Sequence, residues 1–234
     1  MSTVITPHTS DEVDSASGAP DQRFVLQGIE WDAYRKISDA LMERHLRMSY
    51  DRGRLELRTI SGLHGTLCRL LARLVETLTE EFGLPCRNCG DMTCDSESLE
   101  RGIEPDECFY IDNEPDVRGK DNIDLAVDPP PELAIEVDVT RDSRRRLSIY
   151  SAIGVPEVWR FDGTSLSVYV RQPDGVYQIV DHSPRFPTIP PAELETIVAR
   201  RAELDQNALV RLFRDRIREL IGGRPPEQFG GRIS

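Results

Sequence analysis

The sequence predicts a single α/β (α+β) domain, in which helices flank a mixed β-sheet core. Two observations predict this class. Short apolar runs, some alternating with polar residues, recur between residues 47 and 180, as is typical of strands. Longer stretches at 64–83 and 190–220 repeat apolar residues every three or four positions, as is typical of helices. A chain of 234 residues suits one such domain with tails.

The first ordered segments are expected to be a helix, a hairpin and a long helix. The helix is expected at 31–45, where Trp31 and Tyr34 begin a helical apolar spacing. Residues 47–60 alternate around Asp51-Arg52-Gly53 and predict the hairpin. The long amphipathic helix at 64–83 is expected to end at Gly83.

Short strands are expected through the rest of the chain, and the strongest pattern is at 132–140. Weaker strands are expected at 86–95, 107–111 and 122–127. A helix at 143–154, capped by Ser143 and stopped by Gly154, precedes a meander at 157–163, 165–172 and 175–180. Residues 190–220 predict one long helix or two shorter ones.

Both ends of the chain are expected to be tails around a domain at 23–221. Residues 1–22 are polar and predict a disordered tail, and the glycines and prolines of 222–234 predict a flexible one. The N-terminus lacks a basic segment followed by an apolar one, and no run reaches the ~18 apolar residues of a membrane span. We therefore expect a cytoplasmic protein with no membrane association.

The formal net charge is −12, from 29 Lys and Arg against 41 Asp and Glu. This composition counts against a long, tight DNA footprint, because such binders neutralise many phosphates with basic residues. It does not exclude an enzyme that places metal ions between its own carboxylates and a phosphate. Cys86 and Cys89 form a CxxC, but a structural zinc site usually needs a second pair, so packed cysteines are the favoured interpretation.

Two acidic positions on the 132–140 strand point to metal chemistry. Leu133, Ile135 and Val137 face one way, so Glu136 and Asp138 project together from the other face. Two like charges on a half-buried strand are costly unless a cation lies between them. About thirty residues upstream, Pro105 makes a rigid entry for Asp106, which leads into an apolar strand. The three carboxylates, from Asp106, Glu136 and Asp138, are the candidate metal ligands.

The segments GIEPDECFYI, PPPELAIEVDVT and RLSIYSAIGVPEVWRFDG resemble the Uma-two family of restriction endonucleases, in the PD-(D/E)xK nuclease superfamily. The resemblance covers roughly residues 25–215. It implies a restriction-endonuclease-like fold and hydrolysis of phosphodiester bonds in DNA with Mg²⁺ or Mn²⁺. Asp106 would be the acid of the "PD" element and Glu136 that of the "(D/E)xK" element, with the Val137 carbonyl as a further ligand. A homodimer is expected by analogy with this fold.

The sequence departs from the superfamily at the lysine. Asp138 stands at that position, and the place of a displaced lysine on the following helix is taken by Arg146. A guanidinium does not deprotonate in a protein, so lysine-type activation of water is in doubt. Arg146 could instead hold a phosphate or neutralise charge in the transition state. Asp138 would then act as a base or as a ligand of a second metal ion.

Several flanking residues have two interpretations each. His64 either contacts substrate or a carboxylate at the site edge, or packs structurally at a helix start. Arg144 and Arg145, together with Arg141, either contact backbone phosphates or form a solvated helix face. Trp159 and Tyr150 are expected in the core. For the whole protein, the alternative to an endonuclease is an inactive nuclease-like module that binds nucleic acid or protein. A further alternative is a structural or regulatory protein whose acidic residues bind Ca²⁺.

Overall fold

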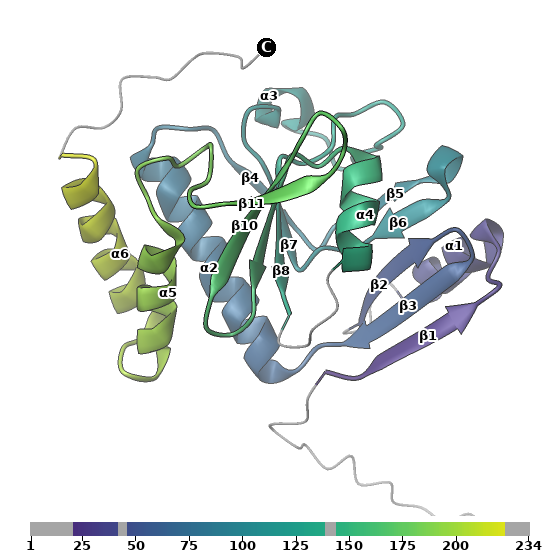
Figure 1. Cartoon of the computed structure of the whole chain (residues 1–234), viewed down its shortest axis with the longest axis horizontal. Coiled ribbons are helices and arrows are strands. Elements are labelled where there is room, and N and C mark those ends of the chain that lie inside the picture. Colours follow the sequence, from purple (N-terminus) through teal and green to yellow (C-terminus); the bar gives the residue numbers. More distant parts are fainter. Residues whose placement is uncertain (1–20, 42–45, 139–143, 223–234) are drawn as a thin grey trace, which may run out of the picture.

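Two β-sheets organise the chain, as Figure 1 shows for this computed structural model. The structure describes residues 21–41, 46–138 and 144–222. The first sheet has six strands in the order β11-β10-β9-β8-β7-β4, with β8 and β9 parallel and the other neighbours antiparallel. Its strands are β4 (Arg87–Gly90), β7 (Glu107–Tyr110), β8 (Leu133–Val137), β9 (Glu157–Phe161), β10 (Leu166–Arg171) and β11 (Tyr177–Val180).

The second sheet has five strands in the order β1-β3-β2-β6-β5 and is antiparallel throughout. Its strands are β1 (Arg23–Gln27), β2 (Leu46–Asp51), β3 (Arg54–Thr59), β5 (Cys94–Ser96) and β6 (Arg101–Ile103). Because β4 and β7 belong to the first sheet, the chain passes between the sheets several times. This interleaving brings β3 and β8, far apart in sequence, to one junction.

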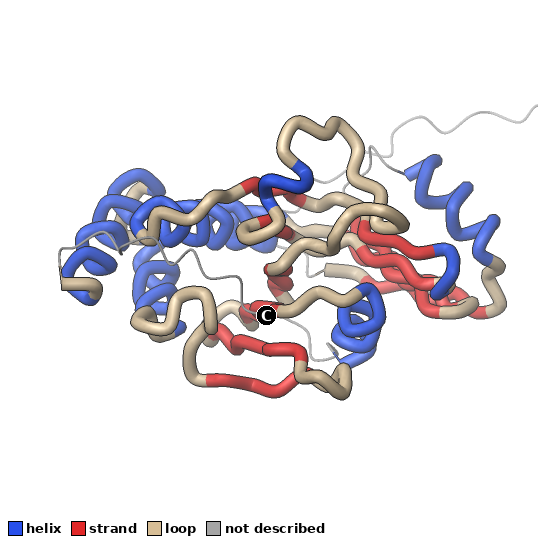
Figure 2. Tube along the Cα trace, turned by 90° about the horizontal axis from the view of Figure 1, so that it is seen from above, coloured by secondary structure: helices blue, strands red, loops and turns tan. Residues whose placement is uncertain are grey.

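Helices cover the six-stranded sheet on both faces (Figures 1 and 2). One face carries the long helix α2 (Gly62–Glu81), with α5 (Pro191–Ala199) and α6 (Gln206–Leu220) beside it. The other face carries α4 (Arg144–Ile153), which also contacts β5 and β6 of the five-stranded sheet. Strand β8 is consequently buried along its whole length, so its polar side chains must find partners inside the protein.

The remaining short elements pack around the two sheets and the helices that cover them. Helix α1 (Trp31–Leu41) packs on the five-stranded sheet through Tyr34, whose ring stacks on Tyr50. The other elements are α3 (Glu114–Val117) and the 3-10 turns η1 (Glu97–Leu99) and η2 (Arg200–Ala202). In the part of the chain that the structure describes, no helix has both the length and the apolar character that crossing a membrane would demand.

The predicted hairpin and long helix are confirmed, and their ends have clear local causes. The β2–β3 turn places Arg52 at φ 44° and Gly53 at φ 89°, the two positive angles that a tight hairpin of type I′ requires. Helix α2 begins where Ser61 Oγ accepts a hydrogen bond from the His64 backbone N–H at 3.3 Å. It ends just before Gly83, which has φ 64°.

Three expectations about the strands and helices need correction or completion. The strand expected at 86–95 is two strands, β4 and β5, which lie in different sheets. Residues 122–127 form no strand, because Asp124 organises a turn there. Its side chain accepts a hydrogen bond from the backbone N–H of Ala126, and its backbone carbonyl accepts one from that of Val127. Residues 190–220 form two helices, because Asp205 caps the start of α6.

Candidate functional site

Asp106 is the anchor of the candidate site and lies where the chain enters β7. Its backbone N–H donates to the Ile135 carbonyl at 3.1 Å, which ties it to β8. The side chain is fully buried. Oδ2 accepts the backbone N–H of Val137 at 2.7 Å, and Oδ1 accepts Nη2 of Arg58 at 2.8 Å. Both carboxylate oxygens therefore have a partner within the protein.

Glu136 lies in β8, where the alternation of the strand predicted it opposite the apolar face, and its side chain contacts α4. Its Oε1 accepts Nη2 of Arg146 at 2.6 Å and the hydroxyl of Tyr150. Arg146 and Tyr150 lie four positions apart, on one side of α4. Within the described residues, Oε2 of Glu136 is buried without a hydrogen-bond partner, and Nη2 of Arg58 lies 3.7 Å from it. One oxygen of this carboxylate is thus held and the other is unsatisfied.

The guanidinium of Arg58 lies between the two carboxylates. Nη2 is the atom that approaches both Asp106 and Glu136, and Nη1 donates to the Val137 carbonyl at 3.3 Å. Arg58 comes from β3, so the site is built across the junction of the two sheets. The sequence predicted that the acids share a cation, and in this structure an arginine side chain occupies that position.

His64 lies in the first turn of α2 and is buried against Asp106. Its Nε2 is 3.0 Å from Oδ1 of Asp106, and its Nδ1 is 2.9 Å from Oδ2 of Asp21. The structure therefore places His64 against a carboxylate, one of the two contacts expected for a site-edge residue. A contact with substrate stays a prediction.

Asp138 follows β8, and two of its contacts are with strand β9. Its backbone N–H donates to the Phe161 carbonyl at 2.9 Å, and Oδ2 is 3.6 Å from Nε of Arg160. Among the described residues, one group of three metal-capable side chains has all its ligand atoms within 4.8 Å of one another, and it consists of His64, Cys68 and Asp106. Asp106, Glu136 and Asp138 do not form so tight a group, and their shared role as metal ligands stays a prediction.

The arginines around α4 differ in what they can reach. Arg146 is buried, and its Nη2 donates to the Glu104 carbonyl at 3.0 Å as well as to Glu136. It therefore points into the protein and holds a carboxylate. Arg145 is exposed at the start of the helix, and Arg144 is the first residue of α4. Arg141 lies outside the described residues, as does Ser143 with its expected cap.

The pKa values of the two central carboxyl groups, Asp106 and Glu136, are shifted in opposite directions. Burial alone would raise the pKa of Asp106, but the charge of Arg58 and the contact with His64 outweigh it, so this pKa is lowered. Burial raises the pKa of Glu136, and repulsion from Asp106 adds to this, while Arg146 offsets only part of the increase. One carboxyl group is thus held ionised beside another that resists ionisation, a pattern common in sites that use two acids in different roles.

The chemistry of the available atoms fits a hard divalent cation. The carboxylate oxygens of Asp106 and Glu136 and the Val137 carbonyl are ligands that Mg²⁺ prefers, and Oε2 of Glu136 is the buried oxygen that lacks a hydrogen bond. A softer site at His64, Cys68 and Asp106 fits less well. Burial raises the pKa of the Cys68 thiol well above its usual range, whereas metal binding needs the thiolate.

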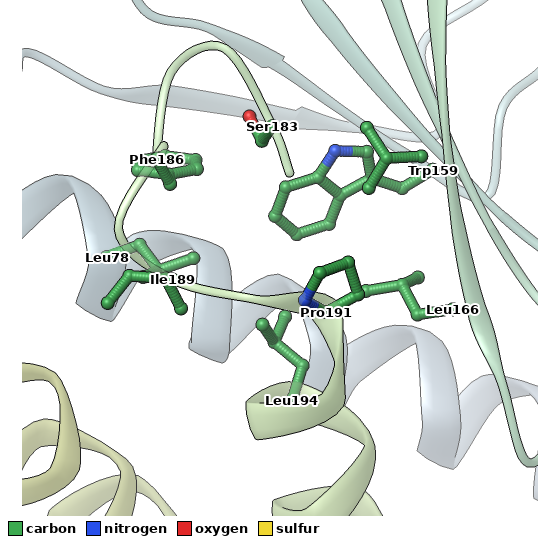
Figure 3. A pocket seen from close by; sticks show the side chains of 9 residues that line it. Leu78, Trp159, Leu166, Ser183, Phe186, Ile189, Pro191 and Leu194 are labelled. Atoms are coloured by element: carbon green, nitrogen blue, oxygen red, sulfur yellow. The ribbon is translucent and has the colours of Figure 1, made fainter. Parts of the chain in front are cut away.

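Two cavities lie elsewhere and do not include the predicted site residues. The one in Figure 3 has a volume of about 10 Å³ and lies under Trp159. Its apolar walls mark it as a packing gap in the core. It is lined by Leu78, Trp159, Leu166, Val168, Ser183, Phe186, Ile189, Pro191 and Leu194. A cleft of about 330 Å³ lies between β4 and residues 121–123.

Sequence reasoning missed two important side chains of the site. Tyr150 was expected in the core, where it lies, but its hydroxyl also donates to Glu136. The helical spacing from Arg146 to Tyr150 was a usable signal for this role. Arg58 had no comparable signal, because Asp106 is 48 residues away and the contact exists only after the two sheets meet.

Comparisons with known proteins agree with this architecture. A family model, Uma2, described as "Putative restriction endonuclease", matches residues 31–201. A similar solved structure is a putative nuclease belonging to DUF820 from Anabaena variabilis ATCC 29413, with a TM-score of 0.50 and 16% identity. That match covers 73% of this chain and 99% of the other, and it shows a shared fold. Curated proteins gave no significant match.

The family match spans well over half of the chain and includes Asp106, Glu136 and the helix that carries Arg146. The comparison with the solved structure independently supports a nuclease fold, as the sequence predicted. The chain belongs to the Uma2 family of putative restriction endonucleases.

Proposed function

We propose that this protein is a metal-dependent endonuclease that hydrolyses phosphodiester bonds in DNA. The observation that carries the proposal is the pair of buried carboxylates, Asp106 and Glu136, which come from separate segments and both approach the guanidinium of Arg58. Membership of a family described as restriction endonucleases supports the class of reaction and of substrate.

Asp106, Glu136 and the Val137 carbonyl would hold Mg²⁺ or Mn²⁺, with Asp138 as a further ligand or a base. When bound, such an ion supplies Lewis-acid stabilisation of a phosphate oxygen and makes water a better nucleophile at neutral pH. Arg146 and Tyr150 fix the Glu136 side chain by binding one of its oxygens. Nε2 of His64 lies 3.0 Å from Oδ1 of Asp106 and supports that carboxylate. Arg145, and Arg144 beside it, would contact the DNA backbone.

The test is cleavage of double-stranded and single-stranded DNA with Mg²⁺ or Mn²⁺. We expect Asp106→Asn and Glu136→Gln each to lower the rate by at least about 100-fold, because each removes a carboxylate charge that would hold the ion acting on the reacting phosphate. Asp116→Asn, on the exposed face of α3, is the matched control and should cut like the parent. Circular dichroism and a melting curve verify folding. Parental rates in either site variant would refute the proposed roles.

A second function is favoured by the arginines themselves. Arg58 and Arg146 already compensate Asp106 and Glu136, which is the arrangement expected of an inactive nuclease-like module. Such a module would bind DNA in EDTA, measured by fluorescence anisotropy, with no turnover in any divalent metal. Cleavage of DNA by the parent protein that is lost in both Asp106→Asn and Glu136→Gln would exclude this second function.

A further inference from the structure

The position of Arg58 has a chemical consequence for the site. Its guanidinium contacts Oδ1 of Asp106 at 2.8 Å and the Val137 carbonyl at 3.3 Å, and it lies 3.7 Å from Oε2 of Glu136. These three oxygens are the ones that the proposed function assigns to the metal ion. The side chain of Arg58 is only 8% exposed, so its charge is poorly screened by solvent.

A divalent ion and this guanidinium exclude one another at these atoms. Magnesium–oxygen bonds are about 2.0–2.1 Å long, and the ion would need lone pairs of Oδ1 of Asp106 and of the Val137 carbonyl, which Arg58 now hydrogen-bonds. Two cations sharing these oxygens would also repel one another strongly, because both would be buried. Arg146 creates no such conflict, because it binds the other oxygen of Glu136.

We propose that Arg58 is a built-in competitor of the divalent ion, so that the metal binds only when the Arg58 side chain leaves Asp106 and Glu136. The inference rests on the proposed function, because it concerns the same site. The arginine keeps the buried carboxylates compensated while no metal is bound, and it weakens metal affinity by the free energy needed to displace it. Asp138 is a further carboxylate whose charge acts on Arg58 and favours its ionised form.

Calorimetric titration with Mn²⁺ in the absence of DNA tests the competition without relying on activity. Arg58→Met removes the competing charge at similar side-chain length, so we expect Mn²⁺ to bind at least about tenfold more tightly than to the parent. Arg54→Met is the matched control, because it removes the same charge from the same strand at a residue paired with Glu56. We expect its Mn²⁺ affinity to equal that of the parent. Adding Asp106→Asn to Arg58→Met should abolish binding.

The outcomes separate the inference from the proposed function. Equal or weaker Mn²⁺ binding by Arg58→Met, with binding still dependent on Asp106, overturns the competition and leaves the metal site intact. Absence of Mn²⁺ binding in both proteins overturns the metal site and the competition together.

A crystal structure of the parent protein soaked in Mn²⁺ covers the case in which Arg58→Met fails to fold. An anomalous peak at Asp106 and Glu136 with Arg58 turned away supports the inference. An ion at those carboxylates with Arg58 still on Oδ1 of Asp106 refutes it.

Discussion

Arginine–carboxylate pairs occur in two contrasting regions of this molecule. At the junction of the sheets, Nη2 of Arg146 lies 2.6 Å from Glu136, and the two side chains are 8% and 4% exposed. Between α6 and α2, Nε of Arg218 lies 2.7 Å from Glu81, and the side chains are 55% and 10% exposed. The two nitrogen–oxygen distances are nearly equal, but the arginine of the second pair is much more exposed to water than the arginine of the first.

The pKa values of the two paired carboxyl groups, Glu81 and Glu136, are shifted in opposite directions. Burial would raise the pKa of Glu81, but the hydrogen bonds from Arg218 and Arg214 outweigh it, and the pKa is lowered. Burial raises the pKa of Glu136 by more than Arg146 can offset. Burial therefore decides the energetic role of each pair more than its geometry does. The Arg218–Glu81 pair is a minor surface contact, whereas the Arg146–Glu136 pair neutralises a charge that water does not reach.

Breaking the junction pair is expected to have the largest effect. Arg146→Met leaves Glu136 buried beside Asp106 without its cation, and we expect a loss of about 3–5 kcal/mol in the free energy of unfolding. Urea denaturation at neutral pH measures it. The double variant Arg146→Met with Glu136→Met should recover much of the loss, because no charge is then left unpaired. A loss below about 1 kcal/mol would place this pair with the surface contacts.

Glu107 lies between the two extremes and sharpens the comparison through pH. Burial raises its pKa to about 7, and hydrogen bonding with Asn88 offsets only part of this. The pKa of Glu107 is higher in the folded protein than in the unfolded chain. The folded protein therefore keeps its full stability below about pH 4.5, and the contribution of Glu107 to the free energy of unfolding is lost as the pH rises through 7. Glu107→Gln should therefore be about 1–2 kcal/mol more stable than the parent at pH 8, a value reduced for solvent screening, and about equal at pH 4. Urea denaturation at both pH values checks this, and an equal gain at the two would exclude titration of Glu107 as the cause.

The helix pair should show the smallest effect. Arg218→Met is expected to leave the free energy of unfolding nearly unchanged, because Arg214 still binds Glu81 and the lost charge was solvated. Melting curves of the parent and of Arg218→Met, measured in low salt and in about 1 M NaCl, should converge at the higher salt concentration, because screening removes the attraction between Arg218 and Glu81. A loss as large as that of Arg146→Met would show that exposure does not separate the two regions.

The candidate site was partly predictable because its chemistry follows local patterns. Strand alternation placed Glu136 on the face opposite Ile135, and Pro105 marked Asp106 as a strand entry. Helical spacing likewise predicted α2, and the turn residues predicted the β2–β3 hairpin. The split of 86–95 into β4 and β5 was not predictable, because sheet membership depends on pairing with strands far away in sequence.

By itself, the sequence determined the long helix α2, the β2–β3 hairpin and the two acidic residues at the centre of the candidate site. Only the tertiary structure decided which cation lies between those two acids, and it is Arg58 from the other sheet. The physical reason is that periodicity and turn chemistry act between neighbouring residues, whereas the neutralisation of a buried charge depends on which distant strand the fold brings beside it.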